Sequence, residues 1–151
     1  MLIEIQLSDR LAENVYVPSE ELLQAWALTV FQQQSVDDVE LFIRVVDKAE
    51  SQGLNKDYRN KDAPTNVLSF PIDAPEYVVP RVLGDLVICA EVVDAESQAQ
   101  DKSRDAHWAH MVVHGILHLL GFDHEDDDQA QQMEDLEIEI IQGLGFAKPY
   151  E

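Results

Sequence analysis

The stretch from residue 114 to residue 124, HGILHLLGFDH, constrains the fold of this chain more than any other. Its first part predicts a helix, because apolar residues leave only one narrow polar stripe. His114 and His118 are four residues apart, so they lie on one helical face, where two imidazoles can bind one metal ion. Gly121 predicts the end of the helix, since glycine adopts the left-handed C′ conformation without steric cost. The chain can then turn back and bring His124 to the same ion.

Three imidazoles with an open fourth position are typical of catalytic zinc sites, whereas structural zinc sites fill all four positions with protein ligands. We therefore expect one divalent ion, with zinc as the expected metal, although nickel, copper and iron also bind imidazole. His107 and His110 lie near the same stripe, but we interpret them as satisfied core or surface residues. His110 is eight residues from His118, about 12 Å along a helix, which is too far for both to bind one ion.

The spacing of the three histidines resembles the metzincin protease signature H-E-x-x-H-x-x-G-x-x-H, but Gly115 replaces the glutamate that acts as general base. A ligand set without that base resembles the YbeY family of bacterial endoribonucleases, whose pattern is H-G-x-L-H-L-x-G-y-D-H. A second block, from Tyr58 to Asp62 and from Thr65 to Pro71, is also similar to this family. Family members often carry Asp where this chain has Asn66.

The resemblance implies a metal-dependent, single-strand-specific endoribonuclease that acts in ribosomal RNA maturation and ribosome quality control. It also implies contacts with ribosomal proteins or with an assembly GTPase of the small subunit. Arg59 and His114 are the expected catalytic residues. Arg59 is chosen because the planar guanidinium of an arginine pairs with phosphate in bidentate fashion. Lys61 is a second candidate for phosphate binding, equal to Arg59 on sequence alone. Asp123 could orient a histidine N–H, or it could simply be a turn residue after the helix.

The formal net charge of −20 argues against a general nucleic-acid binder, and we expect no DNA partner. The charge is unevenly distributed along the chain. Residues 44–61 hold five basic and three acidic residues, so this window has a net charge of +2. It predicts a cationic surface on an acidic body, and a solvated helix and loop is an equally good interpretation from charge alone.

Hydrophobic periodicity predicts alternating strands and helices without a regular βαβ repeat. The expected strands cover residues 3–7, 39–46, 67–70 and 84–89. The expected helices begin after Ser19, cover 47–52 with a stop at Gly53, and cover 91–100, 105–120 and 130–144. Residues 55–66 and 71–81 are expected to be loops, and Arg59 lies in the first of them.

One α+β domain over residues 1–151 follows from these elements. We expect a mixed sheet of about four strands with helices packed on it, and the histidine helix should be central and mostly buried. The N-terminus lacks a secretory signal, and no apolar run is long enough to span a membrane. The single cysteine, Cys89, is expected to be an inert buried thiol, which fits a cytoplasmic protein.

Two other functions remain open on these residues. The chain could be a ribosome-assembly adaptor with a structural metal, its acidic body docking on basic ribosomal proteins. It could also be a metal hydrolase acting on peptides or small molecules, although Gly115 weakens the peptidase alternative.

Overall fold

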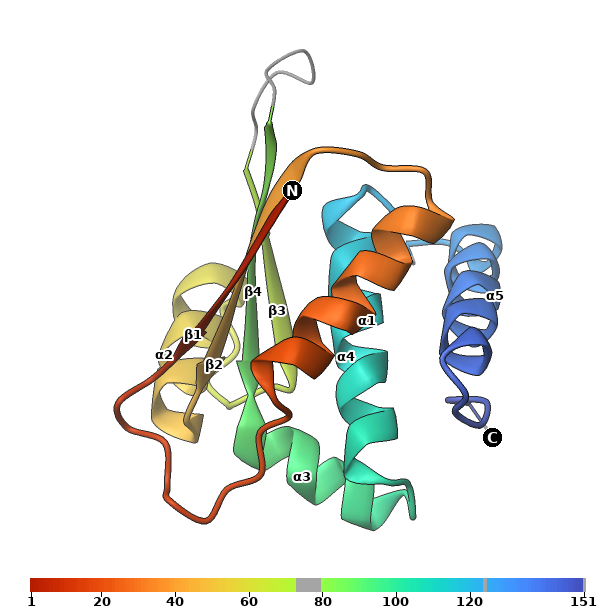
Figure 1. Cartoon of the computed structure of the whole chain (residues 1–151). Coiled ribbons are helices and arrows are strands. Elements are labelled where there is room, and N and C mark those ends of the chain that lie inside the picture. Colours follow the sequence, from red (N-terminus) through yellow and green to blue (C-terminus); the bar gives the residue numbers. More distant parts are fainter. Residues whose placement is uncertain (73–79, 124, 151) are drawn as a thin grey trace.

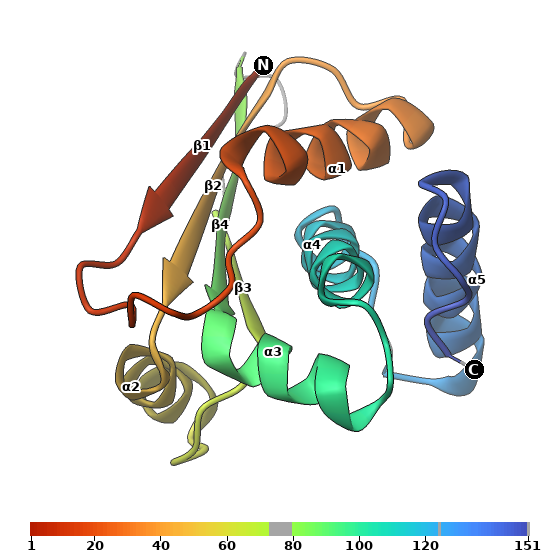
Figure 2. The same cartoon turned by 60° about the horizontal axis from the view of Figure 1, so that its bottom comes forward.

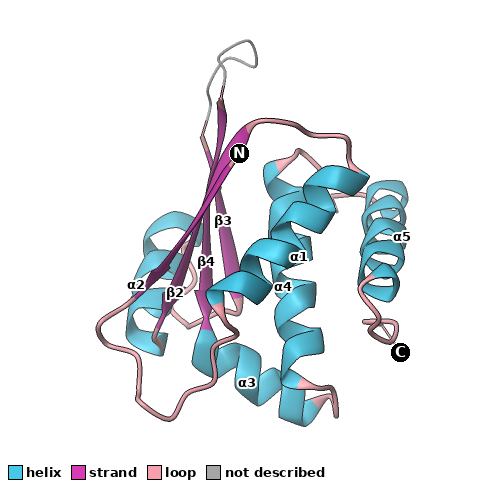
Figure 3. Ribbon diagram, viewed as in Figure 1, coloured by secondary structure: helices cyan, strands magenta, loops and turns pink. Residues whose placement is uncertain are grey.

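The computed structural model describes residues 1–72, 80–123 and 125–150 of the chain. Within these ranges four strands and five helices form the predicted α+β domain (Figure 3). The elements follow one another in the order β1 (Leu2–Leu7), α1 (Glu20–Gln33), β2 (Val39–Val46), α2 (Lys48–Arg59), β3 (Val67–Pro71), β4 (Arg81–Cys89), α3 (Ala90–Ala99), α4 (Arg104–Leu119) and α5 (Asp127–Gly143).

The four strands form one mixed sheet in the order β1-β2-β4-β3. β1, β2 and β4 are parallel, and β3 is antiparallel to β4. The register between β2 and β4 shifts at Leu83, because Glu40 pairs with Val82 while Leu41 pairs with Gly84. Gly84 has a φ of 140°, and a Cβ there would lie 2.2 Å from the carbonyl oxygen of Phe70 on β3. Only glycine allows the two strands to approach so closely.

The two faces of the sheet are covered unequally (Figure 1). α1 and α4 pack on one face, α5 lies beyond α4, and α2 covers the other face (Figure 2). The larger core lies on the α4 side, where alternate side chains of β2 such as Leu41 and Ile43 are fully buried. A smaller cluster lies beneath α2: Val46, Leu68, Val87 and Cys89, with Leu54 packed against them.

The histidine helix α4 is central and mostly buried, as predicted. It lies between the sheet and α5, with α1 and α3 beside it (Figure 2). Trp108, Val112 and Ile116 are completely buried along it. Gly121 has a φ of 103° just after the end of this helix, which confirms the predicted glycine stop. Ser19 likewise caps α1, since its side chain accepts a hydrogen bond from the Leu22 amide.

The prediction for α2 was wrong. The helix does not stop at Gly53 but continues to Arg59, and Asn60 then adopts the left-handed conformation with a φ of 58°. Gly53 is exposed, and a Cβ built on it would have no atom within 4 Å. Its poor helix propensity therefore costs only about 1 kcal/mol. Hydrogen bonds from Ser51 and Asn55 to residues 63–65 outweigh this cost, and the predicted loop 55–66 shortens to 60–66.

Other boundaries moved by a few residues. β4 begins at Arg81 instead of residue 84, and α5 begins at Asp127 instead of residue 130. Asp126 caps α5 by accepting a hydrogen bond from the Gln129 amide, so the acidic run before it forms the helix start. Most of the predicted loop 71–81 lies outside the described residues.

Cys89 is 1% exposed and forms no disulfide, and burial raises the pKa of its thiol. The buried position agrees with the prediction of an unreactive thiol. No helix in the described ranges combines the length and apolar character that a membrane crossing requires.

Candidate functional site

Four histidines form one stripe along α4. The ring centroids of His107 and His110 are 6.1 Å apart, those of His110 and His114 are 6.2 Å apart, and those of His114 and His118 are 4.7 Å apart. His107 and His110 are buried, whereas His114 and His118 are partly exposed. The stripe therefore runs from the core to the surface, and its outer end carries the pair that the sequence predicts as metal ligands.

Glu137 of α5 lies behind His114. Its carboxylate is 0% exposed, and Oε1 lies 2.5 Å from Nδ1 of His114. Burial alone would raise the pKa of Glu137, but the neighbouring His110 and His114 outweigh it and lower that pKa to about 2. Desolvation also lowers the pKa of His110, so its neutral form is favoured. The interior of the site thus holds the ionised carboxylate of Glu137 beside the neutral imidazole of His110.

His110, His114 and Glu137 form a group that could hold a metal ion. Their ligand atoms all lie within 4.8 Å of one another, among the described residues. Imidazole nitrogen and carboxylate oxygen are common donors to divalent transition metals, and neutral imidazole is the form that binds. The donor types along the stripe therefore fit such an ion.

A cavity of about 740 Å³ opens beside the outer histidines. Its wall combines four parts of the chain: the end of α2, β3 with the two residues before it, α4 and the turn after α4. Arg59, His114 and His118 all line it, so the structure brings together residues that are more than fifty positions apart in the sequence.

Arg59 reaches this cavity from the last turn of α2, not from a loop as the sequence predicted. Buried Ser51 and Asn55 tie α2 to the segment that follows it. The Ser51 hydroxyl bonds both the amide and the carbonyl of Thr65 at 3.0 Å, and the Asn55 side chain donates to the Ala63 carbonyl at 2.9 Å. Arg59 is therefore held by a rigid helix whose end is anchored to the cavity wall.

The remaining predicted residues differ in position. His124 lies outside the described residues. Lys61 is exposed and does not line the cavity, unlike Arg59. Asp123 lines the cavity beside the end of α4. Of the basic window 44–61, Arg44 points elsewhere, since it forms an ion pair with Glu50 at 2.7 Å.

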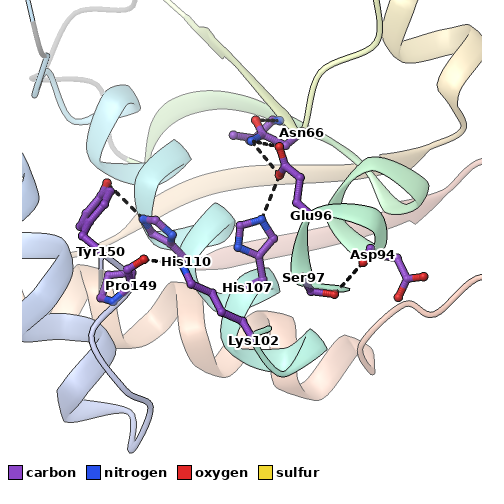
Figure 4. A network of polar contacts seen from close by, with 10 residues as sticks. Asn66, Asp94, Glu96, Ser97, Lys102, His107, His110, Pro149 and Tyr150 are labelled. Carbon is purple, nitrogen blue, oxygen red and sulfur yellow. Dashed lines mark hydrogen bonds and ion pairs between the residues drawn. The ribbon is translucent and has the colours of Figure 1, made fainter. Parts of the chain in front are cut away.

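Asn66 and His107 belong to one polar network (Figure 4). The Asn66 amide donates to both oxygens of Glu96, at 3.1 and 3.3 Å, and His107 Nε2 lies 2.9 Å from Glu96 Oε1. The interaction with His107 lowers the pKa of Glu96, although burial opposes this. The network joins the start of β3 to α3 and α4 at the inner end of the stripe, so His107 has a structural partner, as predicted for a core histidine.

Gly115 faces the sheet. A Cβ at this position would lie 2.7 Å from a methyl carbon of Leu86 and 3.3 Å from one of Val67. The glutamate that a metzincin carries here would therefore enter the packed core between α4 and the sheet. The missing peptidase base is thus a consequence of how closely this helix packs on its sheet.

Sequence reasoning missed Glu137, although a signal for it was present. In the last helix, Met133, Ile140 and Ile141 point into the core. Glu137 lies between them on the same face, about one helical turn from Met133 and from Ile141. A charged residue at a core position is almost never buried without a partner. Such a residue could have been matched to the histidine stripe.

Comparison with known proteins agrees with the fold of this chain. The solution structure of TM1509 from Thermotoga maritima has the same fold, with a TM-score of 0.59 and 23% sequence identity. The match covers 99% of this chain and 99% of that chain. The family model described as endoribonuclease YbeY matches residues 8–145, which supports an RNA-cleaving hydrolase in rRNA processing. This match covers most of the sequence and includes the whole histidine stretch, so the chain belongs to the endoribonuclease YbeY family.

Proposed function

We propose that this protein is a metal-dependent, single-strand-specific endoribonuclease that acts in ribosomal RNA maturation and ribosome quality control. One observation carries the proposal: Arg59, His114 and His118 line a single cavity of about 740 Å³. A phosphate-binding cation beside two imidazoles is the combination that phosphodiester hydrolysis needs.

In this proposal His114, His118 and His124 hold one divalent ion, with zinc as the expected metal. When bound, the ion supplies a Lewis acid for a phosphoryl oxygen and for the attacking water. His114 and His118 would hold the ion from the end of α4, which is rigid because most of that helix is buried.

Arg59 binds the reacting phosphate. Its guanidinium is always charged and presents parallel N–H donors that match two phosphate oxygens. The helix that carries it is fixed, so this cation needs little reordering when RNA binds. Lys61, two residues later, assists as a more distant positive charge.

An exposed aromatic ring beside Arg59 supports the proposed preference for single strands. Tyr58 is 69% exposed, and its ring meets Phe70 edge to face with centroids 4.9 Å apart. An unpaired base can stack on such an exposed ring, whereas a base inside a duplex cannot. The 2′-hydroxyl, which DNA lacks, is the group by which a protein can distinguish RNA from DNA.

Partners and location complete the proposal. With a net charge of −20, most of the surface repels RNA. This acidic surface would instead bind basic ribosomal proteins or an assembly GTPase of the small subunit. The protein then works in the cytoplasm, where ribosomes are assembled.

The first test changes Arg59 without changing the histidines. A lost charged hydrogen bond is worth about 1.5–3 kcal/mol, or roughly tenfold to a hundredfold in rate, and Arg59→Glu should cost more because it adds repulsion. Lys61→Glu is the matched control and should cost less. Cleavage of a single-stranded RNA is measured at equal metal content, with His114→Ala as the inactive reference. Near-normal cleavage by Arg59→Glu would contradict the proposed phosphate site.

The second test concerns the metal. Purified protein should contain about one ion per chain, following the three-ligand rule, and His118→Ala should lose most of it. Elemental analysis of both proteins measures this. Unchanged metal content in the variant would refute the ligand set. RNA cleavage that survives metal removal would refute metal dependence, and metal binding without any cleavage would favour the adaptor alternative.

A further inference from the structure

The buried carboxylate of Glu137 connects three residues. Oε1 lies 2.5 Å from Nδ1 of His114 and 3.6 Å from Nε2 of His110. Oε2 accepts a hydrogen bond of 2.5 Å from the hydroxyl of Tyr150, which also lies 3.3 Å from Nε2 of His110. Figure 4 shows His110 and Tyr150 side by side, with Tyr150 on the segment that follows α5. Glu137 is therefore held on both oxygens at the centre of this cluster.

The hydrogen bond fixes the proton on His114. An ionised carboxylate can only accept hydrogen bonds, so Nδ1 of His114 must be the nitrogen that donates. A neutral imidazole carries one N–H, and its lone pair is then on Nε2. His114 lines the cavity, so this tautomer suits metal binding from the cavity side.

The same distance argues against Glu137 and His114 binding one ion as they now lie. Two ligands of a tetrahedral zinc ion, each about 2.0–2.1 Å from the metal, are roughly 3.3 Å apart. The 2.5 Å between Glu137 Oε1 and His114 Nδ1 is a hydrogen-bond distance. A carboxylate that accepts from the second nitrogen of a metal-binding histidine is a common arrangement, and it raises the basicity of the ligand.

We propose that Glu137 is a positioning residue that holds His114 in its Nδ1–H tautomer with Nε2 directed to the metal, and that Tyr150 in turn fixes the Glu137 carboxylate. This inference rests on the proposed role of His114 as a ligand. The chain thus uses α5 and the residues after it to prepare a ligand on α4, although neither segment lines the cavity that contains Arg59 and His118.

The test uses the full chain and two independent readouts. The ¹⁵N shifts of the His114 ring, measured without metal, report its tautomer directly. Zinc affinity is measured by competition with a chromophoric chelator. Glu137→Gln should give His114 mixed tautomers and weaken zinc binding about tenfold to a hundredfold, the range for loss of such a partner. Glu139→Gln is the matched control, an exposed glutamate on the same helix, and should change neither readout.

Tyr150→Phe is the milder variant. It removes one hydroxyl from a half-exposed side chain, so the fold should be kept even if Glu137→Gln unfolds. Loss of one hydrogen bond to the carboxylate should weaken zinc binding about threefold to tenfold. An unchanged tautomer and an unchanged zinc affinity in Tyr150→Phe would overturn its part in the proposal.

The remaining outcomes separate this inference from the proposed function. A wild-type protein that shows the Nδ1–H tautomer, loses it in Glu137→Gln, yet binds no zinc would support the positioning contact and refute the ligand role. Weaker zinc binding with an unchanged His114 tautomer would overturn positioning. Zinc affinity that falls as far in His110→Gln as in Glu137→Gln would make Glu137 a direct ligand and would also overturn it.

Discussion

Gly115 offers the sharpest test of how α4 packs on the sheet. Gly115→Ala gains about 1 kcal/mol of helix propensity but inserts a methyl group 2.7 Å from Leu86, which is fully buried. Overpacking of this kind costs about 1–3 kcal/mol, so the net change should lie between about 0 and 2 kcal/mol of destabilisation. Gly53→Ala makes the same replacement on an exposed helical face with no atom within 4 Å, so it should gain the full propensity term.

The assay is urea unfolding of both variants beside the wild type. The difference between Gly53→Ala and Gly115→Ala isolates the packing term and should be about 1–3 kcal/mol. In thermal unfolding Gly53→Ala should raise the Tm by about 2–4 °C. Adding Leu86→Val to Gly115→Ala should recover part of the loss, because it shortens the side chain that the new methyl group meets.

Two results would refute this reasoning. Equal stabilisation by Gly115→Ala and Gly53→Ala would show that α4 does not approach Leu86 closely. A Gly115→Glu variant with a free energy of unfolding equal to that of the wild type would show that the position can accept a charge. We expect instead a loss of about 4 kcal/mol or more from an unpaired buried carboxylate, and no peptidase activity.

Two further predictions concern polar contacts. Asn66→Asp places a carboxylate against Glu96, so it should destabilise the protein by about 1–3 kcal/mol at neutral pH. The loss should be smaller in acid, where one of the two carboxyl groups is protonated. Urea unfolding at two pH values measures the difference. Burial and the hydrogen bond to Asp105 raise the pKa of Tyr16 from 10.0 to about 12, so its contribution to stability is complete below pH 10 and is lost as the pH rises through about 12. Tyr16→Phe should remove this pH dependence from thermal unfolding curves, and a profile that persists in the variant would contradict the assignment.

The fold and the outer end of the site could be predicted because they depend on local patterns. The alternation in Val39–Val46 reports a strand with one face on the core, and the glycine after α4 reports where the helix ends. The spacing of His114 and His118 is set by the helix itself, so a sequence pattern is enough to place them together.

The sequence-based prediction failed where contacts between distant residues determine the structure, as at the end of α2 and at Glu137. The continuation of α2 through Gly53 depends on Ser51 and Asn55, whose partners belong to residues 63–65. No local signal states that these polar side chains are buried. For Glu137 the apolar stripe of α5 did give a local signal, but its partner His114 lies twenty-three residues away on another helix, so the pair could not be predicted from local pattern.

The contact between His114 and Glu137 also has a consequence for synthesis of the protein. Chains fold from the N-terminus as they leave the ribosome, so the sheet and α4 emerge before α5. A nascent chain that ends after α4 already carries its histidines, but it lacks both the carboxylate and Tyr150. If Glu137 prepares His114 as proposed, the ligand is ready only after α5 and the residues that follow it have been synthesised. The order of the elements would then delay activity of an RNA-cleaving protein until α5 has left the ribosome and packed against α4.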